Sequence, residues 1–119
     1  VDIRNNVLGV RTPLGVNKGR QAVFIGNARQ VAIENNRISA PGLSATTQRF
    51  QEGIHIFGHL GRMVVVRQNF IANCSDAVTV KPLGQLQHTN QWLVADNMMP
   101  YATNILVAPR QVKNRDNFS

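Results

Sequence analysis

Hydrophobic and polar residues alternate in short runs that recur along the chain. One recurring run is a β-branched strand that ends in asparagine, and its copies end at Asn6, Asn36, Asn69, Asn97 and Asn117. The intervals between these asparagines are 30, 33, 28 and 20 residues. A phrase that returns at intervals of this size indicates a repeat architecture. The period of two within each run predicts β-strands, and no helical period of useful length competes with it.

A second strand phrase lies between the copies of the first. Its copies are residues 22–25, 53–56, 77–80 and 104–107, which we align position by position. A short third strand is predicted after each asparagine, around Ile38, Ile71 and Met99. Each repeat therefore holds two or three strands and no helix. The insertions that vary the period fall in loops between the strands.

These repeats predict an all-β fold, a right-handed parallel β-helix solenoid of about four coils. Residues 1–119 form one domain in this interpretation. Equivalent residues of successive coils would stack about 4.8 Å apart. Alternate strand residues would then form inward aliphatic columns, which we expect to be Val23/Ile25, Ile54/Ile56, Val78/Val80, Ile105/Val107, Val31/Ile33, Val64/Val66 and Trp92/Val94.

Two further columns are expected from the repeat. The recurring asparagine tolerates the left-handed backbone region, so we place it at a sharp bend between two strands. Its stacked side-chain amides would form a hydrogen-bonded ladder. Outward positions of the first phrase carry Arg4, Glu34 and Arg67, whose alternating charges predict an ion-pair ladder.

The phrases at residues 31–36 and 53–56 resemble the repeats of the right-handed parallel β-helix, or pectin-lyase-like, superfamily. The resemblance covers nearly the whole chain. It implies a carbohydrate-interacting segment of a secreted or cell-surface protein, because the superfamily includes polysaccharide lyases and glycoside hydrolases. It also includes phage tailspikes, adhesins and non-catalytic repeats, so a structural or adhesive repeat without chemistry is the alternative.

The two ends of the stack have an expected partner. Because the chain starts and stops within coils, its core would be exposed at both ends unless something covered it. We therefore expect a piece of a longer β-helix, with flanking coils or a partner chain capping the ends.

The charge of the chain points to a polyanionic partner. Thirteen lysines and arginines against six acidic residues give a net charge of +7. An acidic polysaccharide is favoured over nucleic acid, because no nucleic-acid motif or aromatic stacking platform occurs. The chain has no apolar run near the roughly 20 residues of a membrane span. The single cysteine, Cys74, permits no internal disulfide and is expected to be a small buried thiol.

Four residues on the second phrase are candidates for catalysis. Glu52 and Asp76 occupy equivalent positions on adjacent coils, so they could perturb each other or share a cation such as Ca²⁺. His55 and Lys81 project nearby. Two carboxylates could act as general acid and base in glycoside hydrolysis. A lyase would instead use a basic side chain to take the proton α to a carboxylate.

Further residues are candidates for substrate binding in a groove on the same outer face. They are Phe57, His59, Arg62, Thr79 and Arg49. The long loops after Asn6 and Asn36, and the one that follows Lys81, would form the walls of this groove. We expect Phe24, His55, Thr79 and Leu106 to form one column facing it.

A structural interpretation stays open for each candidate. Glu52 and Asp76 could bond turn backbone or Lys81, and an outward His55 could be a solvated side chain. Gly58-His59 and Thr79-Val80-Lys81 are similar to the Gly-His-Gly and Arg-Ile-Lys motifs of polygalacturonase-like hydrolases. Leu60 replaces the second glycine, Thr79 replaces the arginine, and no Asp-Asp pair occurs. These departures argue against hydrolysis of that type.

Overall fold

The structure, a computed structural model, describes residues 1–9, 21–39, 50–84 and 91–119. The chain is all-β in these ranges, and they contain no helix long and apolar enough to cross a membrane. The strands are β1 (Asp2–Arg4), β2 (Val7–Gly9), β3 (Gln21–Glu34), β4 (Arg37–Ser39), β5 (Phe50–Arg67), β6 (Phe70–Ala72), β7 (Cys74–Pro82), β8 (Gln91–Ala95), β9 (Asn104–Val107) and β10 (Lys113–Arg115).

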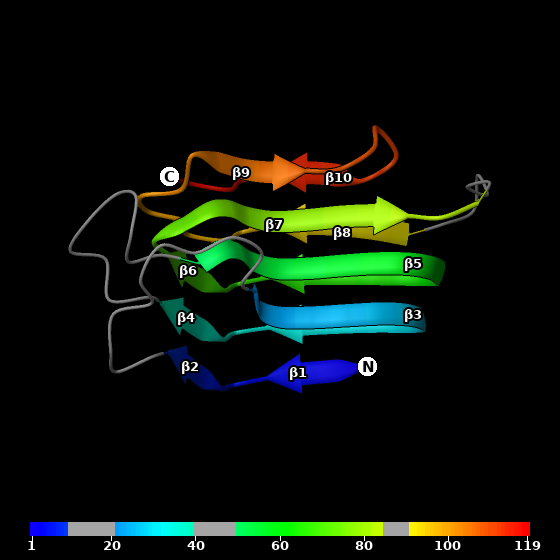
Figure 1. Cartoon of the computed structure of the whole chain (residues 1–119), viewed down its shortest axis with the longest axis horizontal. Coiled ribbons are helices and arrows are strands. Elements are labelled where there is room, and N and C mark those ends of the chain that lie inside the picture. The colour runs from blue at the N-terminus through cyan, green and yellow to red at the C-terminus, as the bar shows by residue number, and fades with distance from the viewer. Residues whose placement is uncertain (10–20, 40–49, 85–90) are drawn as a thin grey trace.

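All the strand pairs are parallel, and strands from successive repeats lie one above the next (Figure 1). One sheet joins β1, β3, β5, β7 and β9, with β8 paired to β5 and β10. A second sheet joins β2, β4 and β6. This parallel arrangement is compatible with a β-helix.

The long strands β3 and β5 each contribute to two rows of pairing. The first strand set consists of residues 21–26 of β3, residues 50–58 of β5, β7 and β9. The second strand set consists of β1, residues 30–34 of β3, residues 63–67 of β5, β8 and β10. The third strand set consists of β2, β4 and β6, continued by isolated bridges through Met98 and Phe118.

The hydrophobic core consists of aliphatic columns that run across the strands. Parallel pairing brings Val23, Ile54 and Val78 into one register. Ile33, Val66 and Val94 form a similar column in the second strand set. Ile38, Ile71 and Met99 supply the buried side chains of the predicted third strand, each with no measurable exposure. Burying stacked aliphatic surface is the main stabilising contribution, at about 25 cal/mol per Å².

The predicted alignment of the last strand is wrong by one residue. β7 pairs with β9 so that Val78 lies beside Leu106 and Thr79 lies beside Val107. Ile105 and Val107 therefore do not continue the column of Val78 and Val80, as the sequence phrase suggested. Both are only partly buried. A slip of one residue moves each side chain to the opposite face, because side chains alternate along a strand.

The five recurring asparagines form a continuous hydrogen-bonded ladder. The Nδ2 of each of the first four donates to Oδ1 of the asparagine in the next repeat, at 3.2, 3.0, 3.0 and 2.9 Å in order from Asn6 to Asn97. The backbone N–H of each donates to the same oxygen. From Asn36 onward, the second Nδ2 proton goes to a strand carbonyl of the preceding repeat. The buried amides of Asn36, Asn69 and Asn97 are thus saturated.

The sharp bend lies one residue earlier than the ladder asparagine. Positive φ angles of 52–58° occur at Asn5, Asn35, Gln68, Asp96 and Asp116, each of which directly precedes a ladder position. The prediction that the ladder asparagine itself takes the left-handed conformation is therefore wrong. Asparagine is required at the ladder position for its amide, and the left-handed residue before it turns that amide toward the neighbouring repeats.

A small residue opens the second phrase because there is no room for a larger one. A Cβ added to Gly53 would lie 2.5 Å from Ile71 Cγ2 and 2.7 Å from the Ala77 carbonyl oxygen. Ala77 itself is fully buried. The strand opener thus sits at an inner corner, where the first strand set approaches the third.

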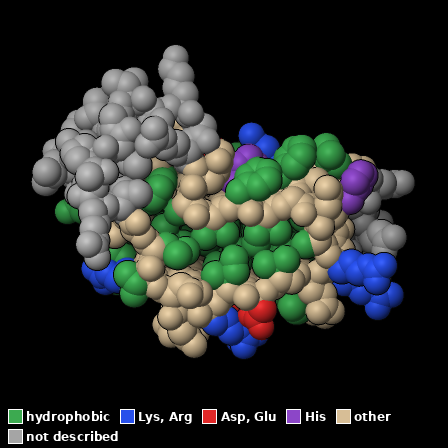
Figure 2. Space-filling view, turned by 60° about the horizontal axis from the view of Figure 1, so that its bottom comes forward, with side chains coloured by type: hydrophobic (Ala, Val, Ile, Leu, Met, Phe, Trp, Pro, Cys, Tyr) green, Lys and Arg blue, Asp and Glu red, His purple; other side chains and the backbone are tan. Residues whose placement is uncertain are grey.

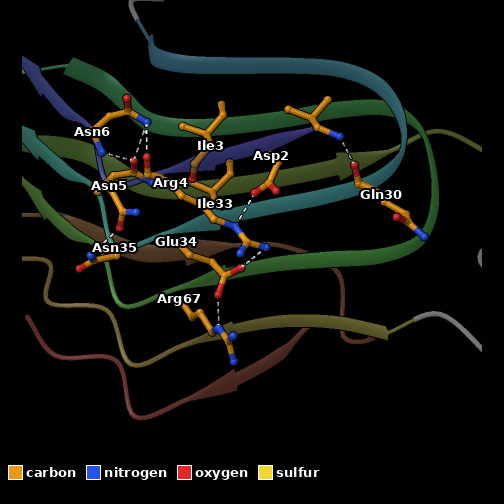
Figure 3. Close-up of polar contacts among 12 residues, drawn as sticks. Asp2, Ile3, Arg4, Asn5, Asn6, Gln30, Ile33, Glu34, Asn35 and Arg67 are labelled. Atoms are coloured by element: carbon orange, nitrogen blue, oxygen red, sulfur yellow. Dashed lines mark hydrogen bonds and ion pairs between the residues drawn. The ribbon is translucent and has the colours of Figure 1, made fainter.

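The outer side of the second strand set carries the predicted ion-pair ladder (Figure 3). Glu34 contacts Arg4 at 3.1 Å and Arg67 at 2.5 Å through its two carboxylate oxygens. Arg4 also contacts Asp2. Both arginines are half exposed, so solvent screening leaves each pair with about 1 kcal/mol or less.

We expect substitution of the central ladder residue to destabilise the fold far more than substitution of an end residue. Asn69→Ala leaves buried donors of Asn36 and the Ile33 carbonyl without partners, at about 1–3 kcal/mol for each unpaired group. Asn6→Ala, at the exposed end of the same ladder, removes only the Nδ2 donor to Asn36 Oδ1, and the backbone N–H of residue 6 still donates to that oxygen. Urea unfolding of both variants measures the difference, and equal losses would contradict the ladder as the central constraint.

Candidate functional site

The candidate residues lie on the outer side of the first strand set, in rows defined by the strand register. One row contains Gln21, Glu52, Asp76 and Asn104. The next outward row contains Phe24, His55, Thr79 and Val107. A third row contains Gly26, Phe57 and Lys81. The expected member Leu106 belongs instead to the row of Val78, because of the one-residue slip in β9.

Glu52 is buried and has two partners. Its Oε2 lies 2.5 Å from Nδ1 of His55, without the alignment of a hydrogen bond. Its Oε1 accepts a hydrogen bond of 3.0 Å from Nε2 of Gln21 in the repeat before. The side chain of His55 is 13% exposed, so His55 is not the solvated side chain of the structural interpretation. The predicted Glu52 and His55 are thus brought together.

Asp76 lies beside Glu52 in register, but it bonds a residue of the following repeat, whereas Glu52 bonds one of the preceding repeat. Its Oδ1 accepts a hydrogen bond of 2.8 Å from Nδ2 of Asn104 in the following repeat. The two carboxylates are therefore flanked by two amides, and each amide donates to its nearest carboxylate. Among the described residues, no group of three or more His, Cys, Asp or Glu side chains could hold a metal ion. The pair alone supplies fewer ligands than the six to eight oxygens that Ca²⁺ takes.

His55 contacts two phenyl rings. Its ring centroid lies 5.3 Å from that of Phe24 and 6.2 Å from that of Phe57, with interplanar angles of 69° and 87°. Both contacts are edge-to-face, the arrangement that aromatic quadrupoles favour. Phe24 is 58% exposed and Phe57 is 38% exposed. The imidazole thus contacts two phenyl rings that remain accessible.

Thr79 is buried rather than accessible from the outer side. Its exposure is 1%, although it lies in the outward row next to His55. Thr79 Oγ1 and His55 Nε2 have no hydrogen-bond partner in the described part of the chain. The prediction that Thr79 faces an open groove is therefore wrong. A buried hydroxyl without a partner has lost its hydration without compensation.

The remaining candidates are divided between two places. Lys81 is exposed and lies in register with Phe57. His59 and Arg62 follow the bend at Gly58, which has a φ of +103° and leaves no room for a Cβ beside Asn27 Oδ1. The same oxygen accepts a hydrogen bond of 2.8 Å from the backbone N–H of His59.

Arg62 lies beyond this bend and lines a hollow of about 390 Å³ with Gln30, Met63 and Gln91. Arg62 thus belongs to the outer side of the second strand set, away from the Glu52 row. Arg49 and most of the loops predicted to wall the groove lie outside the described residues. Cys74 is buried, as predicted.

The sequence interpretation missed three contributors to this surface. Gln21 and Asn104 bond the two carboxylates, although the sequence suggested only turn backbone or Lys81 as structural partners. Phe24 was placed in the outward row, but its contact with His55 was not foreseen. Gln21, Asn104 and Phe24 each lie in a row that also contains candidate residues. Their position in the repeat was therefore the sequence signal that could have identified them.

A search of protein-family models, of curated proteins and of solved structures finds no match to this chain.

Glu52→Ala should lower the free energy of unfolding, whereas Asp76→Asn should leave it nearly unchanged. The alanine removes the partner of Gln21 and the contact of His55 within a largely buried cluster, which costs about 1–3 kcal/mol. An asparagine at position 76 keeps an oxygen for Asn104. Chemical denaturation measures both values, and equal effects would contradict the different burial of the two carboxylates.

Thr79→Val should be neutral or stabilising by up to about 1 kcal/mol. Valine has nearly the same shape and removes the hydroxyl that lacks a hydrogen-bond partner. Thr103→Val serves as a control, because Thr103 is exposed and the substitution keeps its backbone N–H bond to the Ser75 carbonyl. Thermal unfolding compares the variants, and a clear loss of stability in Thr79→Val would show that the hydroxyl has a partner.

Proposed function

We propose that this chain is a segment of a right-handed parallel β-helix of the pectin-lyase-like kind, in a secreted or cell-surface protein, and that it binds an acidic polysaccharide. Support for the architecture comes from the parallel pairing of all strands and from the asparagine ladder that connects five repeats. Right-handed crossovers are the rule for parallel strands.

The observation that carries the binding function is the pair of exposed phenyl rings on the first strand set. Phe24 and Phe57 both contact His55, and the buried Glu52 contacts the same imidazole. Exposed apolar groups fixed in one place on a folded surface commonly mark a binding site. Two rings on neighbouring repeats suit the apolar faces of successive sugar rings.

Charge supports an acidic ligand rather than a neutral one. Lys81 lies in register with Phe57, is exposed, and has no ion-pair partner in the described ranges. The net charge of +7 adds a long-range attraction for a polyanion. A carboxylate or sulfate of the ligand would pair with the Lys81 ammonium while its sugar ring contacts Phe57.

Binding without catalysis agrees best with the contacts of the two carboxylates. Both oxygens of Glu52 are engaged, and Asp76 is bonded to Asn104. His59 and Arg62 follow the Gly58 bend rather than joining Glu52 and His55. The described residues therefore offer a positioned aromatic and basic surface, and each of the two carboxylates is bonded to an amide of a neighbouring repeat.

A structural or adhesive repeat is the second candidate function. The saturated amides of Asn36, Asn69 and Asn97 favour it, since they contribute to stability without leaving any group for a ligand. In that case the outer rings would have no saccharide partner.

Phe57→Ala and Lys81→Gln should each weaken binding to pectate or alginate about fivefold to tenfold, the effect of roughly 1–1.4 kcal/mol. The first loses apolar contact and the second loses an ion pair. Tyr101→Ala and Lys113→Gln are matched controls, because Tyr101 is 80% exposed and Lys113 is exposed outside the first strand set. Isothermal titration calorimetry at two salt concentrations measures the affinity.

Binding of wild-type protein should weaken as salt rises, because the exposed charges are screened. A loss in Lys113→Gln equal to that in Lys81→Gln would indicate attraction by net charge alone. No binding to any acidic polysaccharide would contradict the proposed function and favour the structural repeat.

A further inference from the structure

The bend between the second and third strand sets carries two rows of side chains at the surface. The residues that precede the first three ladder positions are exposed and form an amide row, which consists of Asn5, Asn35 and Gln68. The residues that follow those positions form a mixed row, which consists of Val7, Arg37 and Phe70. Both rows line a hollow of about 390 Å³, which we call the Arg37 hollow.

The Arg37 hollow lies on the side of the stack and not at one of its ends. Arg37 and Asn35 belong to the second repeat, and residues of the first and third repeats supply the rest of the lining. The buried residue of the lining, Asn36, is already saturated by the bonds of the ladder. The groups that remain for a ligand are therefore those of the two outer rows.

Arg37 presents a guanidinium that has no acidic partner. Its Cζ lies 4.3 Å from the centroid of the Phe70 ring, a cation–π contact between neighbouring repeats. This contact uses none of the N–H donors, and the described residues give Arg37 no ion pair. The ring thus restricts the position of the cation before a ligand arrives, and the N–H donors stay available.

The amide row also keeps groups for a ligand. Nδ2 of Asn35 donates to Oδ1 of Asn5 at 2.7 Å (Figure 3). Within the described ranges, neither Oδ1 of Asn35 nor the side-chain amide of Gln68 has a hydrogen-bond partner. A primary amide donates through its nitrogen and accepts through its oxygen. The outer amides differ in this respect from the saturated amides of the inner ladder.

The two rows together match a hydroxylated ring that carries a carboxylate. A planar carboxylate can accept two parallel hydrogen bonds from one guanidinium. Sugar hydroxyls both donate and accept, as the amides of Asn35 and Gln68 do. The volume of the hollow is near the lower end of the roughly 300–1,000 Å³ of small-ligand sites, which suits one sugar ring.

Charge confines an anion to this part of the bend. The next two residues in the column of the amide row are Asp96 and Asp116, which adopt the same left-handed conformation. Their carboxylates would repel an anion, whereas the first three members of the column are uncharged. On the face shown in Figure 2, lysine and arginine side chains form separate patches around the rim rather than one continuous basic surface. An acidic ligand would therefore meet small local sites.

We propose that the Arg37 hollow binds a uronate, with the carboxylate on the Arg37 guanidinium and ring hydroxyls on the amides of Asn35 and Gln68. This site is separate from the phenyl rings of the first strand set, and it does not depend on ligand binding there. Because the hollow is open and contacts a single sugar ring, the dissociation constant is about millimolar.

Nuclear magnetic resonance of the isotope-labelled 119-residue chain tests the proposal by titration with D-galacturonate. The expected result is a saturable shift of the side-chain amide signals of Asn35 and Gln68 and of the Nε–H signal of Arg37. The neutral methyl ester of galacturonate should bind at least about fivefold more weakly, because it cannot pair with the guanidinium. Acetate should be weakened to a similar degree, because it has no hydroxyl groups for the amides.

Two variants separate the contribution of each row. Arg37→Gln should weaken galacturonate binding about tenfold, and Gln68→Ala should weaken it about threefold. Arg110→Gln is the matched control, because Arg110 is exposed, does not line the hollow and loses the same charge. Circular dichroism checks that each variant is folded, and Gln68→Ala tests the site by itself if Arg37→Gln does not fold.

Several results would overturn the proposal. They are the absence of a saturable shift at the three reporter groups, acetate binding as tight as that of galacturonate, and an equal loss of affinity in Arg110→Gln and Arg37→Gln. The last result would indicate attraction by net charge alone. The backbone signals of Phe57 and Lys81 report on the first strand set, so shifts confined to them would support the site there and refute this one. The two sites can therefore fail independently of each other.

Discussion

The asparagine ladder is the constraint on which the rest of this structure depends. A buried primary amide has two donor protons and an acceptor oxygen, and each of the central amides satisfies all of them within the protein. Four hydrogen-bonded steps fix the spacing and the register between five repeats. Since side chains alternate along each strand, a fixed register also fixes which residues form the aliphatic core and which face outward.

Much of the fold followed from the sequence because the same residue types recur at equivalent positions. The columns of Val23 and Ile33, the ladder amides and the charges around Glu34 were all predicted from spacing. The position of the left-handed bend could not be predicted, because the residues that adopt it are Asn, Gln and Asp rather than one recurring type. The slip in β9 was missed for a related reason, since a phrase of four residues aligns almost equally well in two registers.

The candidate site was harder to predict than the fold, and the reason is chemical. Sequence position placed Glu52, Asp76 and His55 near one another, but catalysis depends on which groups are left free. Here Gln21 and Asn104 occupy the carboxylates, and Phe24 and Phe57 enclose the imidazole. Gln21, Phe24 and Asn104 come from other repeats, so no local sequence motif indicates these contacts. The polar cluster therefore lies against two phenyl rings on the outer surface through its imidazole.

Because every step of the ladder makes the same kind of contact, the number of repeats can change in evolution without changing those contacts. Every internal step uses the same donors, the same acceptor oxygen and the same strand carbonyl, whatever the length of the repeat between two asparagines. A duplication or deletion of one whole repeat would therefore preserve every kind of contact that its neighbours make. Such a protein could become longer or shorter in units of one repeat without needing a different core. Its intervening loops could change separately.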